Sequence, residues 1–178
     1  MSTHASNTAG NTANAAATAT ATATAPILVR TQEADIVQDG PTSLITLLAD
    51  TPGMTANLAT FHKGSPGAPA HFHTRASEMF HVTEGTMRIL LGEEIVTLET
   101  GDFLLVPPHM PHAFAPAPDT EAKMLVVFTP GMDRFDYYRL LERVYRGEAD
   151  VAELRETSER FDNHYVDSPV WRQALAGA

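Results

Sequence analysis

The sequence predicts an all-β domain followed by a helical extension. Short apolar runs alternate with turns containing Gly or Pro from Ile27 to Phe128, and no long helical pattern interrupts them. After Pro130 the hydrophobic period becomes helical. About eight to ten short strands joined in this way are typical of a β-sandwich or a β-barrel. At 178 residues the chain has room for one domain with a full core.

The first 25 residues differ in composition from the rest of the chain. They are mostly Ala, Thr and Asn and contain no Lys, Arg, Asp or Glu. Without large apolar side chains to bury, such a segment cannot offset the conformational entropy lost on folding. We therefore expect a disordered tail over residues 1–25, a β-domain over residues 26–130 and a helical extension over residues 131–178.

The expected strands are apolar runs bounded by turn residues. Gly85, Gly92 and Gly101 supply the tight connections that antiparallel strands favour. The predicted strands are residues 27–31, 44–49, 58–61, 78–83, 86–91, 95–98, 103–106 and 124–128.

Two helices are expected in the extension. Apolar side chains follow one another at helical spacing from Phe135 to Tyr145, with Gly147 as the residue that ends the helix. Asp150 and Glu153 have the spacing of an N-cap and an acidic third residue, and they open a second helix towards Phe161. We expect the aromatic face of the first helix to pack against the outside of the barrel. The alternative is a lid over a pocket.

Residue types that bind metals gather between Gly67 and His112. His71 and His73 are two residues apart, so on a strand both imidazoles point to the same face. Glu78 would fall on the opposite face of a continuous strand, but a turn over residues 74–77 resets this parity. Together with His112, these residues offer three imidazoles and one carboxylate. That set suits one divalent transition metal, namely Fe, Mn, Ni, Co or Zn.

The spacing resembles the two motifs of the cupin family. The chain reads His71-x-His73-x4-Glu78-x6-Gly85, then Gly101-x5-Pro107-x4-His112. The family patterns are G-x5-H-x-H-x3,4-E-x6-G and G-x5-P-x-G-x2-H-x3-N, and the likeness covers roughly residues 55–130. This chain departs from them at three positions, which are Ser65, His109 and Pro116. The resemblance implies a cupin-type double-stranded β-helix, a jelly-roll barrel, with His71, His73, Glu78 and His112 as metal ligands.

Strand parity also indicates which side chains face the site. Phe80 lies on the same face as Glu78, whereas His81 faces away. Phe114, two residues after His112, is expected to face the cavity as well. We therefore expect a mostly apolar substrate pocket with Phe80 and Phe114 in its wall, joined by alternating members of Met87, Ile89, Met124 and Val126. Glu78 is either a constant ligand or also a general base towards a substrate hydroxyl.

Three functions fit these features. The single-domain length, the histidine–glutamate site and the aromatic helix resemble the quercetin dioxygenase-like mono-cupins. That resemblance implies an oxygen-dependent enzyme acting on a flavonol, an enediol or another small aromatic substrate. The alternatives are a redox-neutral metal-dependent isomerase, cyclase or lyase, and a non-catalytic small-molecule-binding cupin.

The amino-acid composition limits the kinds of partner that we expect this protein to bind. The net charge of −10, from 12 Lys and Arg against 22 Asp and Glu, argues against nucleic acid. The absence of Cys excludes disulfides and thiolate ligands, and no motif for an organic cofactor is present. No apolar run approaches the roughly 20 residues of a membrane span, and no secretory signal is visible. We expect a cytoplasmic protein that binds a small molecule and, as the resemblance implies, forms a homodimer.

Overall fold

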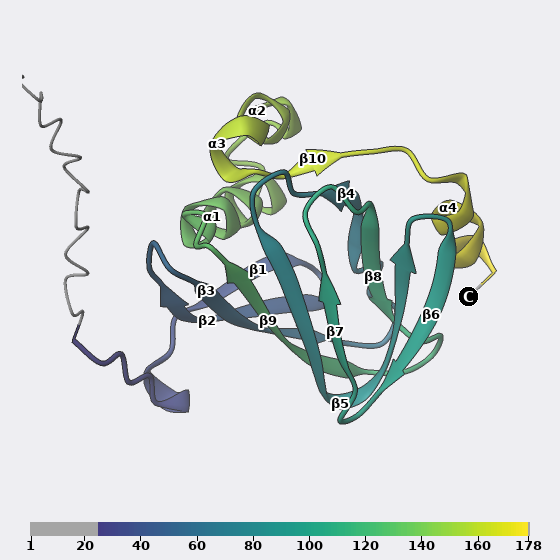
Figure 1. Ribbon diagram of the computed structural model, residues 1–178, viewed down its shortest axis with the longest axis horizontal. Coiled ribbons are helices and arrows are strands. Elements are labelled where there is room, and N and C mark those ends of the chain that lie inside the picture. The colour runs from purple at the N-terminus through teal and green to yellow at the C-terminus, as the bar shows by residue number, and fades with distance from the viewer. Residues whose placement is uncertain (1–24, 178) are drawn as a thin grey trace, which may run out of the picture.

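The computed structural model describes residues 25–177, and its strands form a curled antiparallel β-structure (Figure 1). The sheet order is β1-β2-β3-β9-β5-β8-β4-β10, with β6 and β7 also paired to β5. The tail predicted over residues 1–25 lies outside the described residues except for Ala25. The strands are β1 Ile36–Gly40, β2 Ser43–Asp50, β3 Thr55–Phe61, β4 Ala68–Phe72, β5 Ser77–Leu91, β6 Glu94–Glu99, β7 Phe103–Val106, β8 His112–Pro116, β9 Ala122–Thr129 and β10 His164–Tyr165.

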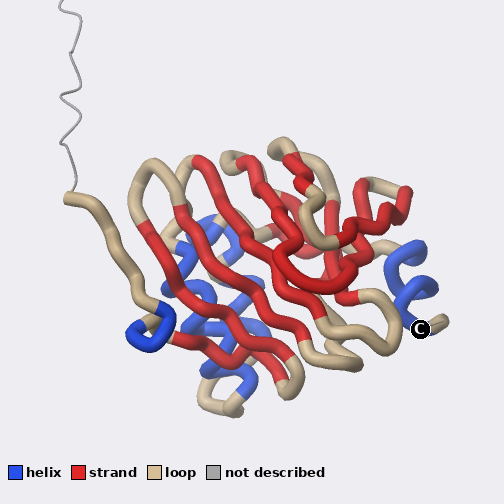
Figure 2. Tube along the Cα trace, turned by 90° about the horizontal axis from the view of Figure 1, so that it is seen from below, coloured by secondary structure: helices blue, strands red, loops and turns tan. Residues whose placement is uncertain are grey.

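The curled β-structure has two layers. Strand β5 belongs to both, because its two halves pair with different strands. The half before Gly85 pairs with β7 and β9, and the half after it pairs with β6 and β8. Gly85 itself has a φ of +74°, and a Cβ there would overlap the carbonyl oxygen of Glu121. Only glycine fits such a position. The two strands predicted over residues 78–83 and 86–91 are therefore one strand, and the curl that results is visible in Figure 2.

Other strand predictions need correction. Residues 27–31 form no strand; Ile27 and Leu28 are exposed, and the first strand lies farther on, over Ile36–Gly40. Strands β4 and β8 were not predicted, because prolines at positions 69, 111 and 116 interrupt their apolar pattern. The remaining predicted strands are present as β2, β3, β6, β7 and β9.

The interior between the layers is filled by alternate side chains of the strands. On β5, Glu78, Phe80 and Val82 are buried, while Met79 and His81 are partly exposed, as the period of two predicts. Burying a large apolar side chain contributes about 1.5–3 kcal/mol, so this core is the main source of stability. Its most buried members are Phe80, Val82, Met87, Ile89, Met124, Val126 and Phe128.

The extension is helical, as its sequence period predicts. Its helices are α1 Arg134–Tyr145, α2 Val151–Glu156, α3 Ser158–Phe161 and α4 Pro169–Ala176. A short 3-10 turn, Thr31–Glu33, lies before β1. Asp150 caps α2 by accepting a hydrogen bond from the amide of Ala152, as predicted. Helices α1–α3 lie together over one end of the β-structure, and the segment through β10 leads across it to α4 (Figure 1).

Helix α1 packs against β1 and β2. Its buried residues Tyr137, Tyr138 and Leu140 join Ile45 and Leu47 in a second apolar cluster. This packing places one side of the helix over the opening of the β-structure. Helix α1 therefore packs on the sheet as expected, and the lid role stays a prediction.

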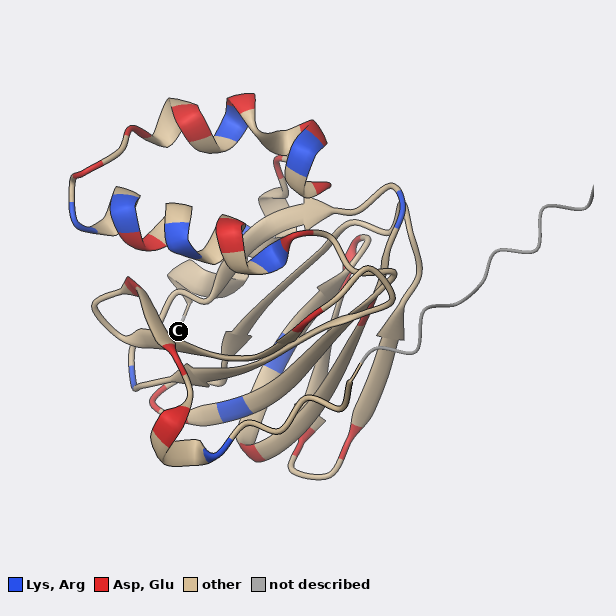
Figure 3. Ribbon diagram, turned by 90° about the vertical axis from the view of Figure 1, so that its left-hand side faces the viewer, with Lys and Arg blue, Asp and Glu red and all other residues tan. Residues whose placement is uncertain are grey.

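Charged side chains are concentrated along the helices and at strand ends, and the strands are otherwise almost free of them (Figure 3). Arg residues alternate with Asp and Glu along α1–α3, and the described residues show no single basic face there. None of the helices in the described part of the chain has the length and hydrophobicity to span a bilayer.

Candidate metal centre

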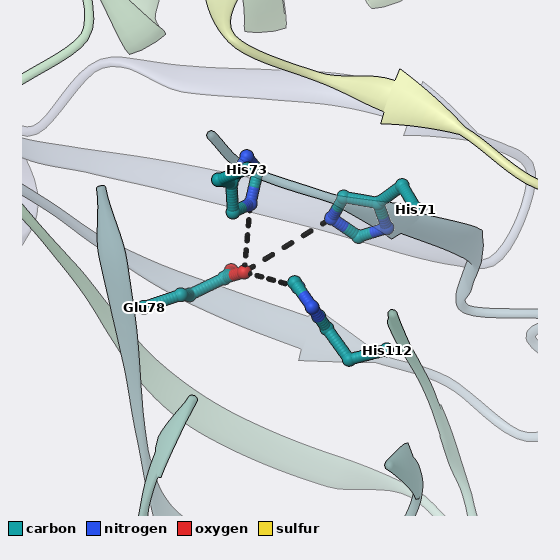
Figure 4. Close-up of side chains that lie close together, drawn as sticks. All are labelled: His71, His73, Glu78 and His112. Atoms are coloured by element: carbon teal, nitrogen blue, oxygen red, sulfur yellow. Dashed lines mark hydrogen bonds and ion pairs between the residues drawn. The ribbon is translucent and has the colours of Figure 1, made fainter. Parts of the chain in front are cut away.

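Four buried side chains converge on one point inside the β-structure (Figure 4). His71 lies on β4, His73 directly follows that strand, Glu78 lies on β5 and His112 begins β8. Their candidate ligand atoms all lie within 4.8 Å of one another, and each side chain is at most 3% exposed. Oε2 of Glu78 is 2.6 Å from Nε2 of His112, 3.0 Å from that of His73 and 4.0 Å from that of His71.

Hydrogen bonds at the opposite ring nitrogen fix the tautomer of each histidine. Nδ1 of His71 lies 2.8 Å from the carbonyl oxygen of Pro69, and Nδ1 of His112 lies 2.8 Å from that of Met110. Nδ1 of His73 lies 2.5 Å from the carbonyl oxygen of Asp162. A carbonyl only accepts, so each Nδ1 carries the hydrogen and each Nε2 offers a lone pair to the common point. Metal-binding histidines are usually oriented in this way.

The charge states of the site also fit a cation. Burial, together with the neighbouring His112 and His73, holds the pKa of His71 well below its usual range, so this imidazole is neutral. Burial opposes ionisation of Glu78, but His112 and His73 hold the pKa of its carboxyl well below its usual range. Neutral imidazole nitrogens and an ionised carboxylate are the forms that bind a divalent metal. The residues present therefore fit the metal that their types predict.

The turn between His73 and Glu78 is held by Asp162, which lies in the extension. Its buried carboxylate accepts hydrogen bonds from the amides of Thr74 at 2.8 Å, Arg75 at 2.9 Å and Ala76 at 3.3 Å. Burial opposes its ionisation, but these bonds and the Thr74 hydroxyl hold the pKa of Asp162 at about 2. The same residue supplies the carbonyl that orients His73. Asp162 thus sets both the spacing and the orientation of metal-site side chains.

A cavity of about 450 Å³ opens beside the cluster. His71 and Glu78 form part of its wall, so the cavity reaches the metal centre itself. Phe114 also lines it, whereas Phe80 is fully buried behind Phe114, with the two ring centroids 5.3 Å apart. Of the four aliphatic residues expected near the pocket, Val126 lines the cavity, and the other three belong to the core.

The comparisons with known proteins identify the β-domain. Residues 57–128 match the family described as the cupin domain. The β-structure of this chain therefore has the cupin fold. No protein of curated function shows a significant match to the sequence.

Solved structures share the cupin fold over about three fifths of the chain. KdgF from Halomonas sp. is 25% identical, with 60% of this chain and 96% of that chain covered and a TM-score of 0.54. The hydroxypropylphosphonic acid epoxidase from S. wedmorenis is 21% identical, with 58% and 59% covered and a TM-score of 0.51. Streptomyces PAC13, solved with uridine and described elsewhere as a nucleoside dehydratase, is 18% identical, with 60% and 84% covered and a TM-score of 0.50. The fold is therefore shared by proteins with different activities.

The far wall of the cavity comes from outside the cupin domain. Helices α1 and α2 and strand β10 contribute the aromatic and apolar side chains Tyr137, Tyr138, Leu154 and Tyr165. The expectation of a mostly apolar lining was incomplete, because buried Arg134 and other polar groups also line the cavity. Sequence reasoning placed the extension near the barrel but did not assign its polar residues to the pocket.

The other histidines of the cupin domain lie apart from the cluster. His81 turns away from Glu78, and its Nδ1 lies 3.1 Å from the carbonyl oxygen of Asp102. His109 is exposed, and His62 is exposed beside Glu121. In the described part of the chain, only His71, His73 and His112 combine with a carboxylate into a possible metal site.

Proposed function

We propose that this chain is a divalent-metal-dependent dioxygenase for a small molecule with two adjacent oxygen atoms, such as an enediol or a flavonol. The observation that supports the proposal most directly is the cavity that reaches His71 and Glu78. Four ligands leave one or two positions free on a five- or six-coordinate metal, and the cavity gives a substrate access to this side of the site. Its volume of about 450 Å³ lies within the roughly 300–1,000 Å³ of small-molecule sites.

Each residue of the site has its own role in the proposed reaction. His71, His73 and His112 would hold Fe, Mn, Co, Ni or Zn through Nε2, and Glu78 would complete the set. When bound, such a metal polarises substrate oxygens, and a redox-active one couples substrate oxidation to oxygen. Glu78 also lines the cavity, so its carboxylate can accept the proton of a substrate hydroxyl. Phe114 and the tyrosines of α1 give the cavity flat walls for a planar substrate.

Oxygen uptake tests the proposal. The protein is loaded with each of the five metals in turn, and oxygen consumption is followed with a panel of flavonols, catechols and aliphatic enediols. We expect uptake with at least one redox-active metal and none with zinc. Absence of uptake in every combination, with metal and ligand binding demonstrated, contradicts the oxygenase.

A substitution of Glu78 separates its two roles. Glu78→Gln keeps the size of the side chain and removes its basicity. If Glu78 acts as a base, the variant retains part of its metal but loses most turnover. A parallel loss of metal and activity shows that Glu78 serves as a ligand alone. His81→Gln lies on the same strand but faces away, so it is the matched control and is expected to keep both properties.

The polar part of the cavity favours a second candidate, a redox-neutral isomerase, cyclase or lyase. A buried positive charge beside the substrate can stabilise negative charge that develops on an oxygen during such a reaction. Conversion of a hydroxy-carbonyl substrate by the zinc-loaded protein without oxygen, followed by NMR, supports this candidate. Ligand binding without any turnover supports the non-catalytic alternative.

A further inference from the structure

Arg134, the first residue of α1, carries a buried positive charge on the cavity wall. Its side chain is 3% exposed, although its guanidinium retains a full charge at every physiological pH. The guanidinium carbon lies over two aromatic rings, 4.6 Å from the centroid of Phe128 and 4.3 Å from that of Tyr137. Its N–H groups point outward in the plane of the guanidinium, so its hydrogen bonds form at the edges.

The protein satisfies the hydrogen-bonding capacity of Arg134 only in part. Nη2 donates to Oδ1 of Asn163 at 2.8 Å, and Nη1 donates to the carbonyl oxygen of Phe161 at 3.4 Å. None of the ion pairs found between residues 25 and 177 includes Arg134. Within the same residues, Nε of Arg134 and Nδ2 of Asn163 are buried without a hydrogen-bond partner. Asn163 is 2% exposed.

A buried guanidinium without an ion-pair partner, next to unpaired buried donors, destabilises a folded protein. Such an arrangement needs a reason, and an anionic ligand in the cavity supplies one, because its charge balances the guanidinium. Arg134 and Asn163 line the same cavity as His71 and Glu78. A molecule in this cavity can therefore contact both groups of residues.

We propose that Arg134 and Asn163 form a carboxylate-binding subsite, so that the substrate is a small acid that presents a carboxylate to them and other oxygen atoms to the metal centre. This assignment rests on the proposed function only in placing the second group of the substrate at the metal. A planar carboxylate matches the planar guanidinium, because two oxygens can lie in its plane and accept from two parallel N–H groups. A phosphate carries more negative charge than this single buried cation balances.

Ligand pairs that differ by one carboxylate test the subsite. Zinc-loaded protein, which does not consume oxygen, is titrated calorimetrically with catechol and with 2,3- and 3,4-dihydroxybenzoate. We expect at least one of the two acids to bind at least about tenfold more tightly than catechol, the ratio for one charge-assisted hydrogen bond. The corresponding dihydroxyphenylphosphonate is expected to gain less than the carboxylate, and a larger gain would assign the subsite to phosphate-like groups.

Two substitutions locate the effect. Arg134→Met removes the charge, and Asn163→Asp places a carboxylate at the position that now lies 2.8 Å from Nη2, where it acts as an internal counter-ion. Both are expected to reduce the preference for the acid to within about twofold of catechol. Asn163→Asp neutralises the buried charge and is expected to fold at least as stably as the native chain, so it carries the test if Arg134→Met does not fold.

Two other arginines serve as controls. Arg155 lines the same cavity but is exposed, so Arg155→Met measures the effect of net charge alone. Arg88 also has a buried unpaired Nε, but it bonds to Ala174 of α4, away from the cavity, so Arg88→Met measures the loss of a partly buried guanidinium elsewhere. Both are expected to retain the preference for the acid.

The subsite is refuted if neither acid binds more tightly than catechol, or if the preference survives both Arg134→Met and Asn163→Asp. Metal content and oxygen uptake are measured on the same preparations. Failure of oxygen uptake with the preference intact removes the oxygenase and leaves the subsite. Loss of the preference with oxygen uptake intact removes the subsite and leaves the oxygenase.

Discussion

Replacing Asp162 with Asn tests how the extension supports the metal centre. In the native chain one carboxylate oxygen accepts from the amide and the hydroxyl of Thr74, and the other accepts from the amides of Arg75 and Ala76. An amide side chain has the same shape but carries an NH₂ in place of one oxygen. With the NH₂ towards Arg75 and Ala76 two hydrogen bonds are lost; with the NH₂ towards Thr74 the hydrogen bond from the amide is lost, while the hydroxyl can turn and accept.

The structure gives the size of the effect in two ways. Hydrogen bonds to a charged group contribute about 1.5–3 kcal/mol each, so losing one or two costs about 1.5–6 kcal/mol. The second measure is the pKa of Asp162, which lies at about 2 in place of an ordinary 3.8. At about 1.36 kcal/mol per pH unit this difference corresponds to about 2 kcal/mol. We expect Asp162→Asn to lower the free energy of unfolding by about 2–4 kcal/mol at pH 7.

The pH dependence has a definite sign. Because folding lowers the pKa of Asp162, its stabilisation is fully present above about pH 4 and is lost as the pH falls through 3.8 towards 2. Urea unfolding of both proteins at pH 7 and at pH 3 therefore shows a smaller difference at the lower pH. The metal content of the variant at pH 7 is also expected to fall, because the turn it disturbs spaces His73 and Glu78.

Asp150→Asn is the matched control. Asp150 is exposed and caps α2, a position where Asn serves about as well as Asp, so we expect a change below about 0.5 kcal/mol. A change of that small size in Asp162→Asn, or one that is the same at pH 7 and pH 3, would refute the role of the carboxylate in holding the turn.

Three further predictions follow from the cupin domain. His112→Ala should cut the bound metal sharply and His81→Ala should not, as elemental analysis will show; the reverse result would contradict the ligand assignment. Gly67→Ala should cost more than the roughly 1–2 kcal/mol of a left-handed residue, because its Cβ would overlap the Phe114 carbonyl, whereas Gly64→Ala meets open space and should cost only that amount in thermal unfolding. Sedimentation should show a homodimer, and a monomer at high concentration would contradict it.

The sequence could predict the ligand cluster because its geometry follows from local rules. The alternation of buried and exposed residues along β5 separates Glu78 from His81, and the two-residue step brings His71 and His73 to one face. Element boundaries were less accurate. The chain continues as one strand through Gly85 because the bend changes partner strands without ending the pairing, which a pattern of apolar residues does not reveal.

The polar residues of the extension could not be predicted in the same way. Asp162 contacts a turn 88 residues earlier in the chain, and Arg134 lines a cavity built mainly from other elements. Such contacts depend on how the elements pack in three dimensions, and no local period records them. The sequence shows Asp162 and Asn163 as two polar residues within an aromatic segment. It does not show which residues they contact.

The hydrogen bond from His73 to the carbonyl of Asp162 joins the metal centre to the extension. Any cation that favours this orientation of His73 also favours the docked extension, and thermodynamic reciprocity requires that a docked extension raise the affinity for the cation by the same factor. Chelation should therefore make the segment after Pro130 more susceptible to proteases. Cleavage there should, in turn, release metal from ligands that all lie before it in the chain.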